Sequence, residues 1–417
     1  MKKVLAVLIA LSMLLCLGLA ACKDSKDPTD SANPDVTGTT KAGDKFTEFD
    51  YNAVKDDATS ADGKYEIAFV TDVGSLKDQS FNQGTWEGIK RYASENSKTY
   101  KYYQPANGDK ATDDDRFNAM KAAADAGAKI VVCAGFLQET ALTKAAQEFT
   151  DVKFVFIDGY TLYSEKDAEG KGIAGKEIKN VAPISFQEEQ SGYLAGYAAV
   201  KDGYSKLGFT GGGGGENPAC CRFGYGFVQG ANDAAKELNK TVEMKYSWSF
   251  GASFSPSPDL QTMLSGWYSN GTEVIFCCGG NMCQSAFEAA GANDGKVIGV
   301  DVDQAGIIDG GYGEGMTVTS AMKGLAPTVE HMLTEVAAGN FSNYGGKIET
   351  LGLVSGDDPE ANYVQIPMES TQWSDSFTQD DYKALVKDMF DGKITVSNDI
   401  SAMPSTSITV NEYGNIK

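Results

Sequence analysis

The sequence predicts an α/β protein built from two lobes, each a doubly wound parallel sheet covered by helices on both faces. Short, continuously apolar segments alternate with amphipathic segments from about residue 65 onward, and this alternation is typical of parallel sheets buried on both faces. The pattern extends over roughly 350 residues, which is more than one open sheet usually holds. Polar residues and glycines directly follow the apolar segments, at the position where such sheets bind ligands.

Seven segments rich in β-branched and aromatic residues are expected to form the strands. They are residues 65–71, 129–133, 153–157, 206–210, 273–277, 296–300 and 316–320. Between them, apolar residues recur at a spacing of three to four, which is typical of helices that pack on a sheet. Met120, Leu142, Leu194 and Phe227 each mark one such helix.

The first 21 residues are expected to be a signal peptide. Two lysines precede an apolar stretch, residues 4–19, that is short for a membrane-spanning helix. The LAAC segment that ends at Cys22 resembles the lipobox of bacterial lipoproteins, in which the cysteine receives a lipid. Cleavage before an unmodified cysteine is the alternative. Residues 22–63 would then be a lipid anchor and a flexible tether, which places the folded body at the extracytoplasmic face of the cell membrane.

The composition excludes some classes of function. The chain has 36 Lys and Arg residues against 57 Asp and Glu residues, and its formal charge of −21 becomes −23 without residues 1–21. Because nucleic-acid binding needs a basic surface, nucleic acid is not expected as a partner. The only histidine, His331, leaves no second imidazole for a site based on several histidines. No metal or cofactor is expected.

The cysteines predict a disulfide. Six remain after loss of Cys16 and lipidation of Cys22, and export favours oxidation. We expect one of Cys220 or Cys221 to bridge to one of a second group, which comprises Cys277, Cys278 and Cys283. Zinc is a weaker alternative, because only Cys278 and Cys283 have a ligand-like spacing. Free thiols would follow from an anaerobic source.

Gly211–Gly215 does not predict a phosphate-binding loop, because no Lys-Ser or Lys-Thr pair follows it. Two interpretations stay open for this run. Its backbone could approach a ligand or the other lobe closely, or the run could form a mobile loop.

The most distinctive motif begins at the end of the first predicted strand and reads TDVGSLKDQSFNQGTWEG from Thr71. Asp78 or Ser80 can cap the helix that follows. Phe81 lies in the first turn, where its ring faces either a cleft or the core, and Trp86 is expected in the core.

Further aspartates follow other strands, at Asp158, Asp301 and Asp303. They suit hydrogen bonds to ligand hydroxyls at least as well as acid–base chemistry, and no catalytic residue is expected.

Several of these motifs resemble the basic membrane lipoprotein family, the purine-nucleoside receptor type of ABC-importer substrate-binding protein. The similar segments are the lipobox, FVTDVG at 69–74, DQSFNQ at 78–83, FVFIDG at 154–159, VAPISFQEEQSGYLAG at 181–196, FGYGFVQG at 223–230, VIGVDVDQ at 297–304 and VTSAMK at 318–323. The resemblance extends from about Tyr65 to about Gly339.

The resemblance implies a type I periplasmic-binding-protein fold, in which two lobes are joined by three hinge crossings and hold the ligand between them. An N-terminal lobe of residues 64–180 plus about 320–350 and a C-terminal lobe of 181–319 plus about 351–417 would follow.

The resemblance also implies a set of ligand-binding residues. Asp72 and Asp78 would line the site, and Asp158 would end a strand at the first crossing. Phe81 would stack on one face of a nucleobase, and a second ring would come from the segment 249–254, where Phe254 fits the spacing better than Phe250.

The ribose hydroxyls would bond to Asp301 and Lys323. Stacking on aromatic rings and charged hydrogen bonds suit a nucleobase and a ribose, respectively.

The expected function is capture of a nucleoside, of the purine type, and its delivery to an ABC permease driven by a separate ATPase. The protein is expected to act as a monomer attached to the membrane by lipid.

Near the predicted cleft, the segments 211–215, 220–221 and 277–282 depart from the family pattern. Riboflavin, a free base or a sugar is therefore an alternative ligand. A nucleoside-hydrolysing enzyme and an adhesin or signalling lipoprotein are the alternatives of other classes.

Overall fold

The computed structural model describes residues 50–73 and 75–414. The predicted signal peptide and Cys22 lie outside these residues. In the described part of the chain, no helix combines the length and the apolar character that crossing a membrane would require.

The predicted tether extends too far into the folded body. Strand β1 (Asp57–Ala58) pairs antiparallel with Tyr100 and Lys101, and Lys90 Nζ donates a hydrogen bond to the Tyr51 carbonyl at 2.6 Å. Residues 50–62 are therefore part of the folded body.

The first sheet has the strand order β1-β3-β2-β4-β5-β6-β12, and β1 is its antiparallel strand. Beyond β1, its strands are β2 (Ile67–Val70), β3 (Tyr100–Tyr103), β4 (Ile130–Ala134), β5 (Lys153–Ile157), β6 (Val181–Phe186) and β12 (Glu349–Leu351). Four helices cover it, namely α2 (Phe81–Glu95), α3 (Asp113–Asp125), α4 (Glu139–Glu148) and α10 (Leu325–Ala337). Together these elements form the first lobe.

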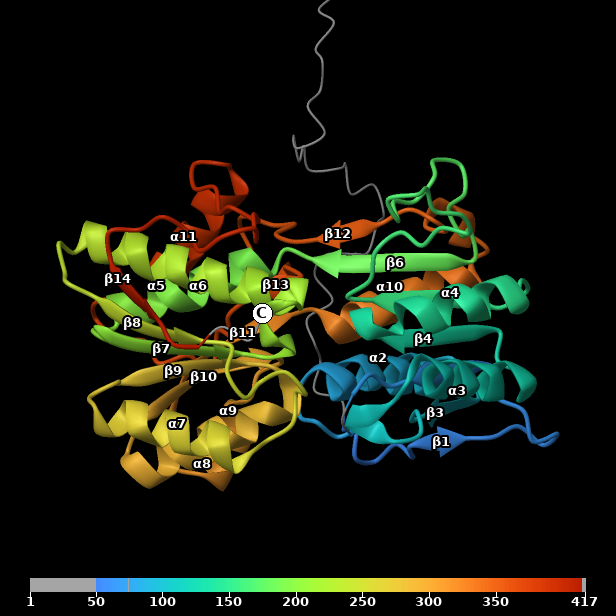
Figure 1. Ribbon diagram of the computed structural model, residues 1–417, viewed down its shortest axis with the longest axis horizontal. Helices are drawn as coiled ribbons and strands as arrows, with labels where there is room; N and C mark the ends of the chain where they lie inside the picture. Colours follow the sequence, from blue (N-terminus) through green and yellow to red (C-terminus); the bar gives the residue numbers. More distant parts are fainter. Residues whose placement is uncertain (1–49, 74, 415–417) are drawn as a thin grey trace, which may run out of the picture. The chain divides into compact units, whose positions relative to one another are not determined.

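Alternation along β2 explains the layers of the first lobe. Phe69 belongs to the core that contains Ile89 of α2, whereas Val70 belongs to a separate core with Met120 of α3. Successive side chains of a strand point to opposite faces, so α2 and α10 cover one face and α3 and α4 the other (Figure 1). Trp86 is buried against Phe69, with ring centroids 5.8 Å apart, which confirms its predicted core position.

The second sheet has the order β13-β11-β10-β9-β7-β8-β14, and β13 is its antiparallel strand. Its strands are β7 (Lys206–Gly211), β8 (Glu243–Ser247), β9 (Val274–Cys278), β10 (Lys296–Asp301), β11 (Thr317–Lys323), β13 (Val364–Gln365) and β14 (Thr409–Glu412). The helices of this second lobe are α5 (Glu188–Lys201), α6 (Pro218–Glu237), α7 (Pro258–Ser269), α8 (Cys283–Asn293), α9 (Ala305–Gly311) and α11 (Gln379–Phe390).

In Figure 1, α5 and α6 lie above this sheet and α7, α8 and α9 below it. Short 3₁₀ turns complete the described chain: η1 (Gly108–Lys110), η2 (Phe136–Gln138), η3 (Gly213–Gly215), η4 (Gly280–Met282), η5 (Phe341–Asn343) and η6 (Pro359–Ala361). The seven predicted strands correspond to β2, β4, β5, β7, β9, β10 and β11, which confirms their assignment.

Helices α5 and α6 pack with their backbones in contact, because glycines face each other across the interface. A Cβ atom on Gly192 would lie 2.1 Å from the Phe223 carbonyl oxygen, and one on Gly226 would lie 2.1 Å from the Glu189 carbonyl oxygen. Any larger residue would therefore push the helices apart. This contact fixes the N-terminal halves of both helices relative to each other.

The chain passes between the two sheets three times, as the fold class predicts. The crossings lie at Gln187 between β6 and α5, at Gly324 between β11 and α10, and at residues 352–363 between β12 and β13. The lobe boundaries therefore fall later than residues 180 and 320, because β6 pairs in the first sheet and β11 in the second. Asp158 does not stand at the first crossing, because β5 is followed by β6 in the same sheet.

Candidate functional site

One pocket lies where the carboxyl ends of the two sheets meet, and it encloses about 530 Å³ of space that includes solvent at its mouth. All seven predicted ligand-binding residues line it: Asp72, Asp78, Phe81 and Asp158 from the first lobe, and Phe254, Asp301 and Lys323 from the second. Residues without a predicted role in ligand binding also line it, among them Asn82, Asn217 and Phe223. Cys220 and Cys278, from segments predicted to lie near the cleft, line it as well.

Asp78 organises the loop before α2 through its carboxylate. Its Oδ1 accepts hydrogen bonds from the backbone N–H groups of Ser80 and Gln83, both at 3.0 Å, and its Oδ2 accepts from the N–H of Asn82 at 2.9 Å. Burial raises the pKa of Asp78 to about 6, although these hydrogen bonds favour the charged form. Asp78 therefore caps the helix, as predicted for Asp78 or Ser80, and leaves the Ser80 hydroxyl for another partner.

Asp72 follows β2 and lies beside the backbone of Gly135. A Cβ on Gly135 would come within 1.9 Å of Asp72 Oδ2, and Gly135 has a φ of +89° that favours glycine. The Val73 N–H donates to Oδ1 of the same carboxyl. Burial raises the pKa of Asp72 to about 7, although the Val73 N–H and Arg116 oppose this rise. At neutral pH this carboxyl can both donate and accept a hydrogen bond.

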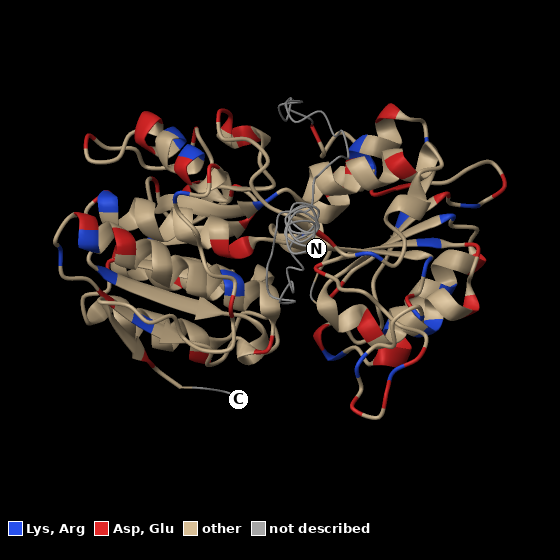
Figure 2. Ribbon diagram, turned by 90° about the horizontal axis from the view of Figure 1, so that it is seen from above, with Lys and Arg blue, Asp and Glu red and all other residues tan. Residues whose placement is uncertain are grey.

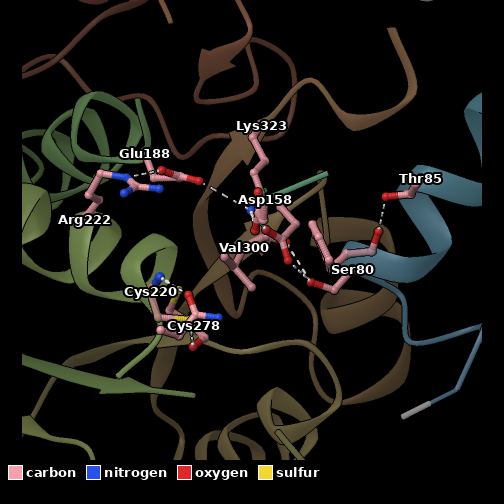
Figure 3. A network of polar contacts seen from close by, with 12 residues as sticks. Ser80, Thr85, Asp158, Glu188, Cys220, Arg222, Cys278, Val300 and Lys323 are labelled. Carbon is pink, nitrogen blue, oxygen red and sulfur yellow. Dashed lines mark hydrogen bonds and ion pairs between the residues drawn. The ribbon is translucent and has the colours of Figure 1, made fainter. Parts of the chain in front are cut away.

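Lys323 ends β11 at the centre of a charged cluster (Figure 3). Its ammonium donates to Asp158 Oδ2 at 2.6 Å and lies 3.6 Å from Asp301 Oδ1 and 3.7 Å from Glu188 Oε1. Its side chain is only 2% exposed. Burial alone would lower the pKa of Lys323, but Asp158, Asp301 and Glu188 together raise it above its usual range. The lysine is therefore a fixed positive charge.

A second ion pair continues this cluster into α6. Arg222 Nε donates to Glu188 Oε2 at 2.6 Å, and Glu188 is fully buried at the start of α5. The pKa of Arg222 is raised, because the attraction of Glu188 outweighs burial. Neither residue was predicted. The sequence signal was weak, because Glu188 lies within the family-like segment 181–196 whereas Arg222 directly precedes the segment 223–230. Their meeting depends on how α5 packs on α6.

Three of the seven predicted ligand-binding residues have left-handed backbone conformations. The φ angles are 54° at Asp158, 69° at Asp301 and 57° at Phe254. Non-glycine residues with such angles carry backbone strain and are concentrated at functional sites. Here the two aspartates turn away from the ends of β5 and β10 towards the pocket.

Aromatic rings surround the charged cluster. The Lys323 ammonium lies 4.7 Å from the ring centroid of Phe81 and 5.6 Å from that of Phe223, within the range of cation–π attraction. Phe254 lines the pocket, whereas Phe250 is 47% exposed.

The glycine run supports the Phe254 ring. A Cβ on Gly212 would lie 2.2 Å from Phe254 Cε1, and one on Gly211 would lie 2.2 Å from Trp248. The close approach predicted for this run is therefore made to rings of the same lobe. None of the residues from Gly211 to Gly215 lines the pocket itself.

The predicted disulfide is wrong. Cysteines 133, 220, 221, 277, 278 and 283 are all free and buried. Cys220 Sγ donates to the Cys278 carbonyl at 3.5 Å, and Cys283 Sγ donates to the Cys277 carbonyl at 2.9 Å. Burial raises the pKa of the Cys278 thiol well above its usual value. Within residues 50–73 and 75–414, no group of three or more His, Cys, Asp or Glu side chains is placed to hold a metal ion.

Two α/β lobes that are joined by three crossings and share a polar pocket have the architecture of a solute-binding protein. An ABC transporter solute-binding protein from Aeropyrum pernix K1 has a TM-score of 0.58 at 20% identity, covering 79% of this chain and 87% of its own. Another, from Conexibacter woesei DSM 14684, also has a TM-score of 0.58, at 22% identity, covering 80% and 99%. These likenesses confirm the predicted fold class.

Residues 65–387 match the family described as ABC transporter substrate-binding protein, PnrA-like, and the chain belongs to this family. The ABC transporter nucleoside-binding protein BmpA of Lactococcus lactis subsp. cremoris is 28% identical over 361 residues, which cover 82% of this chain and 92% of the relative. The predicted family is thus confirmed. Its members bind substrates for transport and are not enzymes, so the hydrolase alternative falls away.

Proposed function

We propose that this protein captures a nucleoside, preferably a purine nucleoside, between its lobes and delivers it to an ABC permease. The observation that carries the proposal is the combination of two phenylalanine rings, Phe81 and Phe254, with a cluster of carboxylates around Lys323 in one pocket. Base stacking on an aromatic ring contributes roughly 1–3 kcal/mol. A purine presents a larger face for stacking than a pyrimidine does.

The charged cluster suits the ribose part of the ligand. Asp301 and Lys323 offer a carboxylate and an ammonium to the hydroxyls, and hydrogen bonds to charged groups are the stronger kind. Asp158 Oδ1 is buried and has no hydrogen-bond partner among the described residues. A donor from the ligand would satisfy this oxygen, which otherwise carries a desolvation cost.

The net charge of the cluster favours a nucleoside over a nucleotide. Lys323 and Arg222 face three carboxylates, those of Asp158, Glu188 and Asp301. A phosphate group would add negative charge beside an excess of negative charge in a buried site, where repulsion is strong. The relative from Lactococcus lactis is named a nucleoside-binding protein, which supports the same ligand class.

Calorimetry on the purified protein tests the ligand class. The panel comprises guanosine, inosine, adenosine, uridine, adenine, ribose, riboflavin and AMP. We expect tight binding of the purine nucleosides, and at least about tenfold weaker binding of AMP than of adenosine because of charge repulsion. Mass spectrometry of ligand retained through purification is the independent measurement. Binding of riboflavin or of a sugar alone would contradict the proposal.

We also propose that Cys22 carries the lipid that holds a monomeric body at the extracytoplasmic membrane surface. In the folded body, acidic and basic residues are interspersed on both lobes (Figure 2), and the chain as a whole is strongly acidic. A body with interspersed charges and an acidic balance is at most weakly attracted to anionic lipids. Cys22→Ala should move the protein from the membrane fraction to the soluble fraction without changing nucleoside affinity. Retention of this variant in the membrane would contradict the lipid anchor.

Delivery to a permease has its own test. Cells that lack this protein should lose uptake of labelled nucleoside at low external concentration and regain it when the protein is restored. A Phe81→Ala variant should restore less uptake, because it should bind nucleoside about tenfold more weakly. Uptake that does not depend on the protein would contradict a role in import.

A further inference from the structure

Glu188 and Lys323 stand beside two of the three crossings. Glu188 is the first residue of α5, directly after the crossing at Gln187, and Lys323 is the last residue of β11, directly before the crossing at Gly324. Figure 3 shows the Glu188 carboxylate between Lys323 on one side and Arg222 on the other. The chain of charges thus lies where the lobes are joined.

The two oxygens of Glu188 have different partners. Oε2 accepts the hydrogen bond from Arg222 at 2.6 Å, whereas Oε1 has no hydrogen-bond partner within the described residues and lies 3.7 Å from Lys323 Nζ. Glu188 does not line the pocket, but Lys323 does. Glu188 therefore contacts the pocket through its ion pair with Lys323.

Of the remaining partners of Lys323, Asp158 lies in the other lobe, whereas Asp301 lies in the same lobe but has a further contact. Asp158 belongs to the first lobe, so separation of the lobes would carry it away from Lys323. Asp301 lines the pocket and already accepts the Ser80 hydroxyl at 2.5 Å. Glu188 and Arg222 belong to the same lobe as β11, because α5 packs on both β11 and α6. An ammonium that loses its counter-charge while buried is strongly destabilised.

We propose that Glu188, oriented by Arg222, is a positioning residue that keeps the Lys323 ammonium in place for the ligand when the lobes are open as well as closed. The role of Lys323 as a ligand contact rests on the proposed function. The placement of Lys323 by Glu188 does not rest on it, and this difference allows the two to be tested separately.

The first measurement needs no ligand. Acylation of Lys323 by an amine-reactive reagent is followed by mass spectrometry in the full-length protein. In Glu188→Gln we expect acylation at least about tenfold faster than in the wild type, because the ammonium loses a fixed counter-charge. The matched control is Glu189→Gln, on the same turn and only 2% exposed. Burial and Glu188 raise the pKa of Glu189 to about 8, so a neutral amide replaces a mainly neutral acid.

A double variant, Glu188→Gln with Arg222→Gln, separates positioning from simple neutralisation of Arg222. We expect it to regain folding stability relative to the single variant while Lys323 stays reactive. Restored protection of Lys323 in the double variant, or unchanged acylation in Glu188→Gln, would overturn the inference.

The second measurement is guanosine affinity by calorimetry in the same variants. Glu188→Gln should bind about tenfold more weakly and Glu189→Gln should match the wild type. Faster acylation of Lys323 in Glu188→Gln, together with a wild type that binds no nucleoside, would contradict the proposed function. It would still support the placement of Lys323 by Glu188. Unchanged affinity in Glu188→Gln, with a wild type that binds, would overturn its positioning role.

Discussion

Ser80 in the first lobe donates a hydrogen bond from its Oγ to Oδ2 of Asp301 in the second lobe, over 2.5 Å. The helix cap that Ser80 would ordinarily provide comes instead from Asp78. The bond therefore joins the start of α2 to the end of β10. As a contact between the two lobes, it would be lost if they separated.

Removal of this hydroxyl should weaken the closed form. We expect Ser80→Ala to bind guanosine about tenfold more weakly or worse, the effect of one lost hydrogen bond to a charged group. Ser75→Ala is the matched control, because Ser75 also accepts a contact across the lobes, from Asn281 Nδ2, but at 3.4 Å and at an exposed position. Calorimetry measures both. Equal effects of the two substitutions would show that the Ser80–Asp301 bond has no special role.

Phe254 and Phe250 provide a second comparison. Both have left-handed backbone conformations in the same loop, but only Phe254 lines the pocket. Phe254→Ala should weaken nucleoside binding about tenfold or more, because a stacking ring is lost. Phe250→Ala should leave the dissociation constant within about twofold, since one exposed ring outside the site is removed. The reverse ranking would move the second stacking surface to Phe250.

The buried carboxyl of Asp72 should make stability depend on pH. Because its pKa is raised to about 7 in the folded protein, the folded state binds the proton more tightly than the unfolded state does. Its favourable contribution is complete below about pH 4 and is lost as the pH rises through 7. Relative to the wild type, Asp72→Asn should gain stability between pH 4.5 and pH 8, on the order of 2–4 kcal/mol. Urea unfolding at both pH values measures this, and a pH-independent difference would contradict it.

The glycine contact between α5 and α6 should be intolerant of a methyl group. We expect Gly226→Ala to lower the free energy of unfolding by about 1–3 kcal/mol or more, and to weaken ligand binding because Glu188 and Arg222 shift. Gly266 in α7 has open space where a Cβ would lie, so Gly266→Ala should stabilise the protein by about 0.5–1 kcal/mol. Thermal unfolding compares them. An unchanged unfolding temperature in Gly226→Ala would contradict this prediction, because it would show that the two helices can move apart without loss of stability.

The cysteines should titrate as thiols. Unfolding in the presence of a thiol reagent should reveal six reactive cysteines beyond the export segment and Cys22, with or without prior reduction. A count that rises after reduction would contradict the free thiols. Guanosine should slow alkylation of Cys220 in the native protein, because this residue lines the pocket.

The sequence predicted the strands that are short apolar runs, and with them the edge where the site forms. Asp158 and Asp301 could be placed because each directly follows such a run. In contrast, β3 contains a lysine and two tyrosines at half-buried positions, and β8 contains an exposed Glu243 and a half-buried Lys245. These strands are not continuous apolar runs and were therefore not predicted. Strand β6 contains a proline, which ordinarily argues against a central strand.

The charged pair and the cysteines show what sequence patterns could not reveal. Glu188 and Arg222 are 34 residues apart, and only the glycine contact between their helices brings them together. Clustering of cysteines along the chain indicated proximity but not the geometry of their sulfur atoms. Cys220 and Cys278 do meet, through a thiol and a carbonyl.

Strand β14 lies outside residues 65–387, the part of the chain shared with the family. It pairs along the whole of its length with the outer side of β8. Without it, the second sheet would present a row of unpaired backbone groups, which can recruit a neighbouring chain. If lipid holds many copies side by side at a membrane, their local concentration is high. Under such crowding, β14 would prevent the edge at β8 from pairing with a neighbouring copy.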